Sequence, residues 1–147
     1  MPGAVEALRA MAARGEVVQS VLTGNLRANA ELKLGLFGLT GLLDAEVGAY
    51  GDDAPERPAL VPVARRRAAA AYGTGFDSDS AVLIGDTPRD VRAGLVGGAR
   101  VIAVASGAYG AAELREAGAD AVLADLRDTA AVLRAVWTPG PAARSSG

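Results

Sequence analysis

The sequence of 147 residues contains neither cysteine nor histidine, and Lys33 is its only lysine. Without cysteine the chain can form no disulfide, thiol nucleophile or thiolate zinc site. Without histidine it lacks the commonest general base and the commonest ligand of transition metals. Because no other lysine is present, a G-K-S/T phosphate-binding motif is excluded. Acid–base and metal chemistry must therefore come from aspartate and glutamate, and anion binding from arginine and backbone amides.

The sequence also lacks a strong charge of one sign and any long hydrophobic run. Fifteen basic and 17 acidic residues leave a formal charge of −2, which gives no electrostatic reason to expect a nucleic acid or an anionic membrane as partner. The longest apolar-rich run, residues 34–43, contains three glycines and is too short to span a bilayer. No signal segment is recognisable at the N-terminus. We therefore expect a soluble cytoplasmic protein with neither a nucleic-acid nor a membrane partner.

Helical and strand-like segments alternate along the chain. We expect helices over residues 5–14, 26–37, 58–72, 91–96, 112–117 and 129–136, and strands over residues 17–22, 45–50, 81–84, 100–105 and 121–123. This alternation predicts an α/β fold, a Rossmann-like parallel sheet in three layers with helices on both faces. Residues 1–137 form one domain in this interpretation, and residues 138–147, rich in proline, glycine and serine, form a disordered tail.

Two carboxylates follow the most distinct strand signal. The apolar run of residues 81–84 ends at Gly85-Asp86, and Pro88 stands where a helix can begin,. Asp86 and Asp90 would then lie at the carboxyl end of a parallel strand, where α/β proteins bind ligands. Oxygen ligands of this kind suit Mg²⁺. Thr87 and Asp90 alternatively resemble a helix capping box, which accounts for Asp90 and leaves Asp86 unexplained.

Two further sites are candidates for binding an anion. Thr23-Gly24-Asn25 follows a predicted strand and precedes a helix, so its hydroxyl and free amides could hold a phosphate. Threonine and asparagine are equally typical of a plain helix N-cap. Arg57 begins the longest predicted helix and is either a phosphate-binding cation or an ordinary surface arginine.

Taken in order and spacing, these three segments resemble the haloacid dehalogenase (HAD) superfamily, and within it the phosphoglycolate-phosphatase-like branch, over residues 1–136. The resemblance implies that Thr23 hydrogen-bonds the transferring phosphoryl group and that Gly24 and Asn25 line the same substrate pocket. It implies a catalytic role for Arg57, which stands where the family usually has lysine. It further implies that Asp86 and Asp90 bind the Mg²⁺ cofactor.

The family's first motif, D-x-D-G-T/S, supplies the nucleophile, and nothing in residues 1–21 resembles it. Its strand lies in the family's sheet between the strands that carry Thr23 and Asp86, and the family's cap domain follows it. We therefore expect this chain to be the C-terminal part of a longer phosphatase. The two unpaired strand edges would invite a complementing N-terminal segment or a second copy of the chain as partner.

The resemblance implies a Mg²⁺-dependent phosphatase whose substrate is a small phosphorylated metabolite. Hydrolysis would pass through an aspartyl-phosphate, formed on a residue that this chain does not contain. The alternative is a catalytically inactive HAD-like module that binds phosphate or a protein partner. A phosphatase assay with an Asp86→Asn control separates the two.

Overall fold

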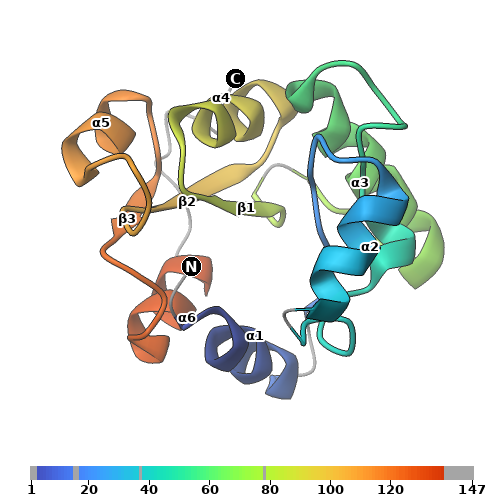
Figure 1. Ribbon diagram of the computed structural model, residues 1–147, viewed down its shortest axis with the longest axis horizontal. Coiled ribbons are helices and arrows are strands. Elements are labelled where there is room, and N and C mark those ends of the chain that lie inside the picture. Colours follow the sequence, from blue (N-terminus) through green and yellow to red (C-terminus); the bar gives the residue numbers. More distant parts are fainter. Residues whose placement is uncertain (1–2, 15–16, 37, 78, 138–147) are drawn as a thin grey trace.

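The computed structural model describes residues 3–14, 17–36, 38–77 and 79–137. Their centre is a parallel sheet of three strands in the order β1-β2-β3, surrounded by helices (Figure 1). Along the chain the elements are α1 (Ala4–Ala13), α2 (Arg27–Leu36), the 3₁₀ helix η1 (Ala45–Val47), α3 (Arg57–Tyr72), β1 (Val82–Gly85), α4 (Pro88–Gly97), β2 (Arg100–Val104), α5 (Ala111–Glu116), β3 (Ala121–Leu123) and α6 (Thr129–Trp137). The predicted α/β fold class is confirmed.

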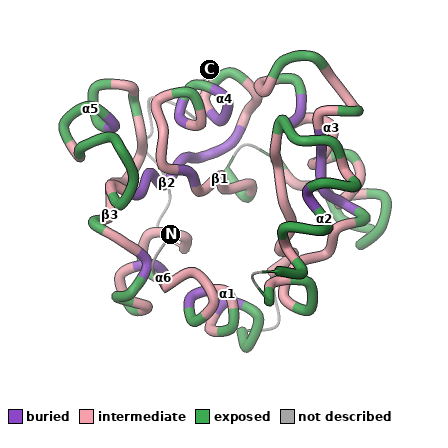
Figure 2. The backbone as a smooth tube through the Cα atoms, viewed as in Figure 1, coloured by how far each residue is buried: buried purple, intermediate pink, exposed green. Residues whose placement is uncertain are grey.

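Strand β2 is the centre of the sheet and is buried along its whole length (Figure 2). Its side chains alternate between the two faces, as the pleat of a strand requires. Val101 and Ala103 pack with residues of α4 and α5, whereas Val104 packs with residues of α1 and α6. Because both faces are covered by helices, β2 is a nearly continuous apolar run, which is typical of a parallel sheet.

Helix α4 begins immediately beyond β1 because the local sequence contains a complete start signal. Thr87 caps the helix, Pro88 occupies its first turn, and Asp90 completes a capping box,. The helix ends at Gly98, whose φ of 90° is the left-handed conformation that glycine adopts without strain,. The turn between β1 and α4 is thereby held in one conformation.

Two predicted strands in the N-terminal third are wrong in extent. Residues 17–22 form no strand, and their single bridge is the parallel pair Leu22–Ala49. In residues 45–50, the first half is η1, because the side chain of Asp44 accepts a hydrogen bond from the backbone N–H of Glu46 and caps a helical turn,. Among the residues that the structure describes, strand β1 pairs only with β2. Within the described residues, no strand therefore lies between the segment 17–22 and β1 to extend the sheet to that segment.

The predicted helices are all present, with ends that differ by at most three residues. In the described part of the chain, no helix combines the length and the apolar character needed to cross a membrane. The expected tail, residues 138–147, lies outside the described residues.

Candidate active site

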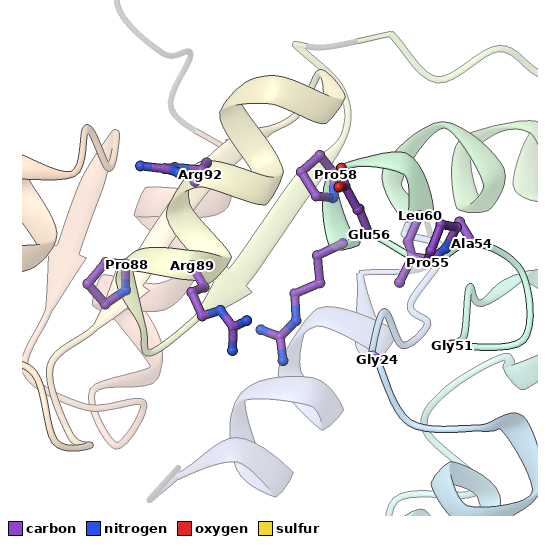
Figure 3. Close-up of a pocket in the computed structure, with 11 residues that line it drawn as sticks. Gly24, Gly51, Ala54, Pro55, Glu56, Pro58, Leu60, Pro88, Arg89 and Arg92 are labelled. Carbon is purple, nitrogen blue, oxygen red and sulfur yellow. The ribbon is translucent and has the colours of Figure 1, made fainter.

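A cavity of about 750 Å³ lies where α3 and α4 begin (Figure 3). The two loops that follow residue 22 and residue 50 form part of its wall. The lining residues come from three separate segments of the chain: Gly24, Gly51, Ala54, Pro55, Glu56, Arg57, Pro58, Leu60, Pro88, Arg89 and Arg92. The cavity thus joins Gly24 and Arg57, which were candidates on the sequence alone, to the first turn of the helix that carries Asp90.

The loop with Gly24 is held in place by the segment that follows η1. The N–H of Thr23 donates to the carbonyl of Ala49, and the N–H of Gly51 donates to the carbonyl of Asn25 at 2.8 Å. A Cβ at Gly51 would stand 2.2 Å from the carbonyl oxygen of Gly24, so only glycine permits this approach. The Thr23 hydroxyl accepts the N–H of Asn25 at 3.1 Å. Gly24 lines the cavity, whereas Thr23 and Asn25 flank it.

Arg57 and Asp90 form an ion pair that connects the two sides of the cavity. The Arg57 guanidinium lies 2.5 Å from Oδ1 of Asp90. The other carboxylate oxygen of Asp90 accepts the N–H groups of Asp86 and Thr87 at 3.1 and 3.2 Å, and Thr87 Oγ1 accepts the N–H of Asp90. The capping box weighed from the sequence is confirmed. Asp90 therefore holds the β1–α4 turn and fixes Arg57 at the same time.

Asp86 is half-buried at the carboxyl end of β1. Its carboxylate lies against Gly107, where an added Cβ would be only 2.9 Å from Oδ2. Likewise, a Cβ at Gly85 would stand 2.4 Å from Cβ of Asp90. These two glycines leave room for the carboxylates of Asp86 and Asp90. Gly107 lies in the turn that follows β2, so this turn borders Asp86.

No group of three or more acidic side chains in the described segments could by itself hold a metal ion. The second acidic pair of the sequence, Asp77 and Asp79, lies in the loop before β1. Asp77 accepts hydrogen bonds from Ser80 and from the N–H of Asp79, and these bonds hold the pKa of Asp77 below its usual value. This loop is exposed and precedes β1, so it lies at the end of the strand opposite to Asp86.

Two polar features near the cavity were not foreseen from the sequence. Arg67 donates to both carboxylate oxygens of Asp53, at 2.6 and 2.9 Å, and to the carbonyl of Gly48. The hydrogen bonds from Arg67, and then the one from the N–H of Tyr50, keep the pKa of Asp53 below its usual value. Arg89 lines the cavity itself. The sequence contains many arginines, and their number does not indicate which of them lie near a site.

A family model described as HAD-hydrolase-like matches residues 56–129, half of the chain. No curated protein matches the chain.

Similar solved structures include a HAD family hydrolase from Deinococcus radiodurans R1 determined with bound phosphate and sodium. It is 28% identical with a TM-score of 0.71, over 97% of this chain and 62% of that chain. A hydrolase from Pseudomonas syringae is 26% identical with a TM-score of 0.72, over 94% of this chain and 60% of that one. A predicted phosphatase from Clostridium acetobutylicum is 25% identical with a TM-score of 0.71, over 90% of this chain and 59% of that one.

This chain therefore spans about three fifths of the length of these three structures. The matched region, residues 56–129, includes Arg57, Asp86 and Asp90. The chain belongs to the HAD-hydrolase-like family.

Proposed function

We propose that this chain provides the phosphate-binding and metal-binding part of a Mg²⁺-dependent phosphatase that acts on a small phosphorylated metabolite in the cytoplasm. The observation that carries the proposal is the convergence of Gly24, Arg57 and the start of α4 on one cavity. Asp86 stands at the end of the strand that leads into this helix. Three segments, each weak evidence alone, thereby supply a cation, backbone amides and a carboxylate to one edge of the sheet.

Arg57 and the loop 23–25 would hold the phosphoryl oxygens. A guanidinium keeps its charge at every relevant pH and presents several donors, and the ion pair with Asp90 restrains Arg57 beside the cavity. The Thr23 hydroxyl, the backbone N–H of Gly24 and the side-chain amide of Asn25 would add neutral donors, since the backbone N–H of Asn25 already donates to Thr23 Oγ1. Such donors stabilise charge on a transferring phosphoryl group because they are oriented before the reaction begins.

The residues at the end of β1 fit a magnesium ion. Mg²⁺ takes oxygen ligands and commonly uses one or two carboxylates together with waters and substrate phosphate. Asp86 offers such a carboxylate, in a space that a side chain at position 107 would fill. Asp90 would complete the site, chiefly by holding Arg57 and the turn, since its oxygens already accept hydrogen bonds. When bound, the ion would neutralise charge on the phosphoryl oxygens.

The proposal places the nucleophile outside this chain. The similar structures are longer than this chain, and among the residues that the structure describes strand β1 pairs on one side only. A strand from a complementing N-terminal segment, or from a second copy, would find backbone groups to pair with at that edge.

Calorimetric titration with inorganic phosphate, with and without Mg²⁺, tests the binding function. We expect Mg²⁺ to strengthen phosphate binding, and Asp86→Asn to lower the Mg²⁺-dependent affinity roughly tenfold or more, because a charged metal ligand is lost. Asp79→Asn is the matched control, since it removes the same charge from the exposed loop at the opposite end of β1. Equal effects of the two substitutions, or an absence of phosphate binding, would contradict the proposal.

Hydrolysis of p-nitrophenyl phosphate tests the position of the nucleophile. We expect no turnover by this chain alone, and turnover when the coding sequence upstream of Met1 supplies an in-frame segment with an aspartate nucleophile. Mg²⁺-dependent turnover by this chain alone would show that the nucleophile is one of its own residues.

A further inference from the structure

The loop 23–25 is bonded to the segment 48–53 and moves with it. Two backbone hydrogen bonds join them, as described above. A further bond, from the backbone N–H of Arg27 to Oδ1 of Asp52 at 2.7 Å, joins the two parts of the chain just beyond the loop. Because of these bonds, a displacement of the segment 48–53 would displace the loop 23–25 as well.

The segment 48–53 is held against α3 by the ion pair of Asp53 and Arg67. Arg67 donates to both carboxylate oxygens of Asp53 and, at 2.7 Å, to the carbonyl of Gly48. The carboxylate of Asp53 also accepts the N–H of Tyr50 at 2.9 Å. Gly48 and Tyr50 are buried, where an unpaired backbone group is costly. The ion pair therefore determines how the segment lies against α3.

Helix α3 also carries Arg57, which lines the cavity from the first turn of the helix. The loop 23–25 reaches the same cavity through Gly24. Within the described residues, the sheet does not position this loop, because the residues before it form a single bridge and no strand. The position of the loop relative to Arg57 is therefore set through α3 and the Asp53–Arg67 pair.

We propose that Asp53 and Arg67 are positioning residues for phosphate binding, whose ion pair holds the loop 23–25 where it and Arg57 contact the same phosphoryl group. This inference rests on the proposed function, which assigns the loop and Arg57 to one group. Neither Asp53 nor Arg67 lines the cavity, so both act through the loop. The geometry is demanding, because donors displaced by about 1 Å lose much of their effect on a ligand.

The affinity for inorganic phosphate in the presence of Mg²⁺, measured by calorimetry, separates positioning from the effect of charge. By Coulomb's law alone, removing the negative charge of Asp53 would strengthen the binding of an anion, and removing the positive charge of Arg67 would weaken it. Positioning predicts the same sign for both. Asp53→Asn and Arg67→Gln should each weaken phosphate binding by roughly threefold or more, as expected when coupled contacts are lost.

Two further variants sharpen this test. The double variant of Asp53→Asn and Arg67→Gln should bind phosphate no more weakly than the weaker single variant, because both substitutions break the same pair. Arg67→Lys keeps the charge and loses the fork of donors, so it should weaken phosphate binding to a smaller extent.

The NMR signals of backbone amides provide a readout that needs no ligand. In the unliganded chain, Asp53→Asn and Arg67→Gln should each shift the ¹H–¹⁵N signal of Gly24 and leave that of Val91, on α4, unchanged. Glu31→Gln is the matched control, because it removes the carboxylate of another ion pair, the one with Arg27 on α2. It should not weaken phosphate binding.

Opposite effects of Asp53→Asn and Arg67→Gln on phosphate affinity would overturn the inference, since charge alone would then explain them. Unchanged affinity, additive losses in the double variant, or an unmoved Gly24 signal would overturn it as well, as would an equal loss in Glu31→Gln. In these cases the unmodified chain still binds phosphate and the proposed function stands. A failure of the unmodified chain to bind phosphate would overturn both.

Discussion

Two apolar stretches of this chain, residues 17–22 and strand β2, have similar sequences and different structures. Strand β2 is paired on both edges, with β1 and β3, and all its residues are buried. Residues 17–22 form one bridge, through Leu22, and are only half-buried. Apolar β-branched residues favour an extended conformation in both. A strand forms only where neighbouring strands accept its hydrogen bonds, and β2 has two such neighbours.

Amide hydrogen exchange should show the largest difference between the two stretches. In the described part of the chain, the backbone hydrogen bonds of residues 17–22 use the carbonyls of Gln19 and Val21, and no amide of this stretch donates to another backbone group. We expect the amides of Ile102 and Val104 to exchange slower by several orders of magnitude, because they open only with the whole domain. Similar protection in both stretches, measured by NMR or mass spectrometry, would show that residues 17–22 are paired in solution.

Truncating one side chain in each stretch sharpens the same comparison. Ile102 is 1% exposed, so Ile102→Ala should reduce the free energy of unfolding by about 2–5 kcal/mol, through lost burial and the cavity left behind. Leu22 is half-buried, and Leu22→Ala should cost about 1 kcal/mol. Urea denaturation measures both. Equal losses would contradict the view that stability resides mainly in the sheet.

Breaking the Asp53–Arg67 pair should have the smallest effect on stability, and this effect should depend on pH. The pKa of Asp53 is lower in the folded chain than its usual value, so the pair contributes stability at neutral pH. That contribution is lost as the pH falls through the folded pKa of Asp53. Asp53→Asn should therefore lower the midpoint of urea unfolding at pH 7, and the difference from the unmodified chain should shrink as the pH falls.

The control for this prediction is Glu116→Gln, which removes one carboxylate from the exposed end of α5. It should leave the unfolding midpoint unchanged over the same pH range. A loss in Asp53→Asn that does not shrink as the pH falls would mean that packing, rather than the charge of Asp53, is responsible.

Signals that lie within a few residues of each other were predictable. Thr87, Pro88 and Asp90 define the start of α4 because a capping box and a first-turn proline act within one helical turn. Strand β1, which immediately precedes these residues, was predictable from local signals in the same way. The family's motif spacing led to Arg57, and its position beside Asp90 is consistent with that assignment.

What the sequence by itself determined was the alternation of helices and strands, the family, and the candidate residues at strand ends. Only the tertiary structure decided that Arg57 meets Asp90, that Gly107 makes room for Asp86, and that Arg89 lines the cavity. It also decided that residues 17–22 form no strand. The physical reason is the separation in sequence between the residues that interact. Caps and turns depend on neighbours in the chain, whereas ion pairs, close approaches and strand pairing depend on segments that only folding brings together.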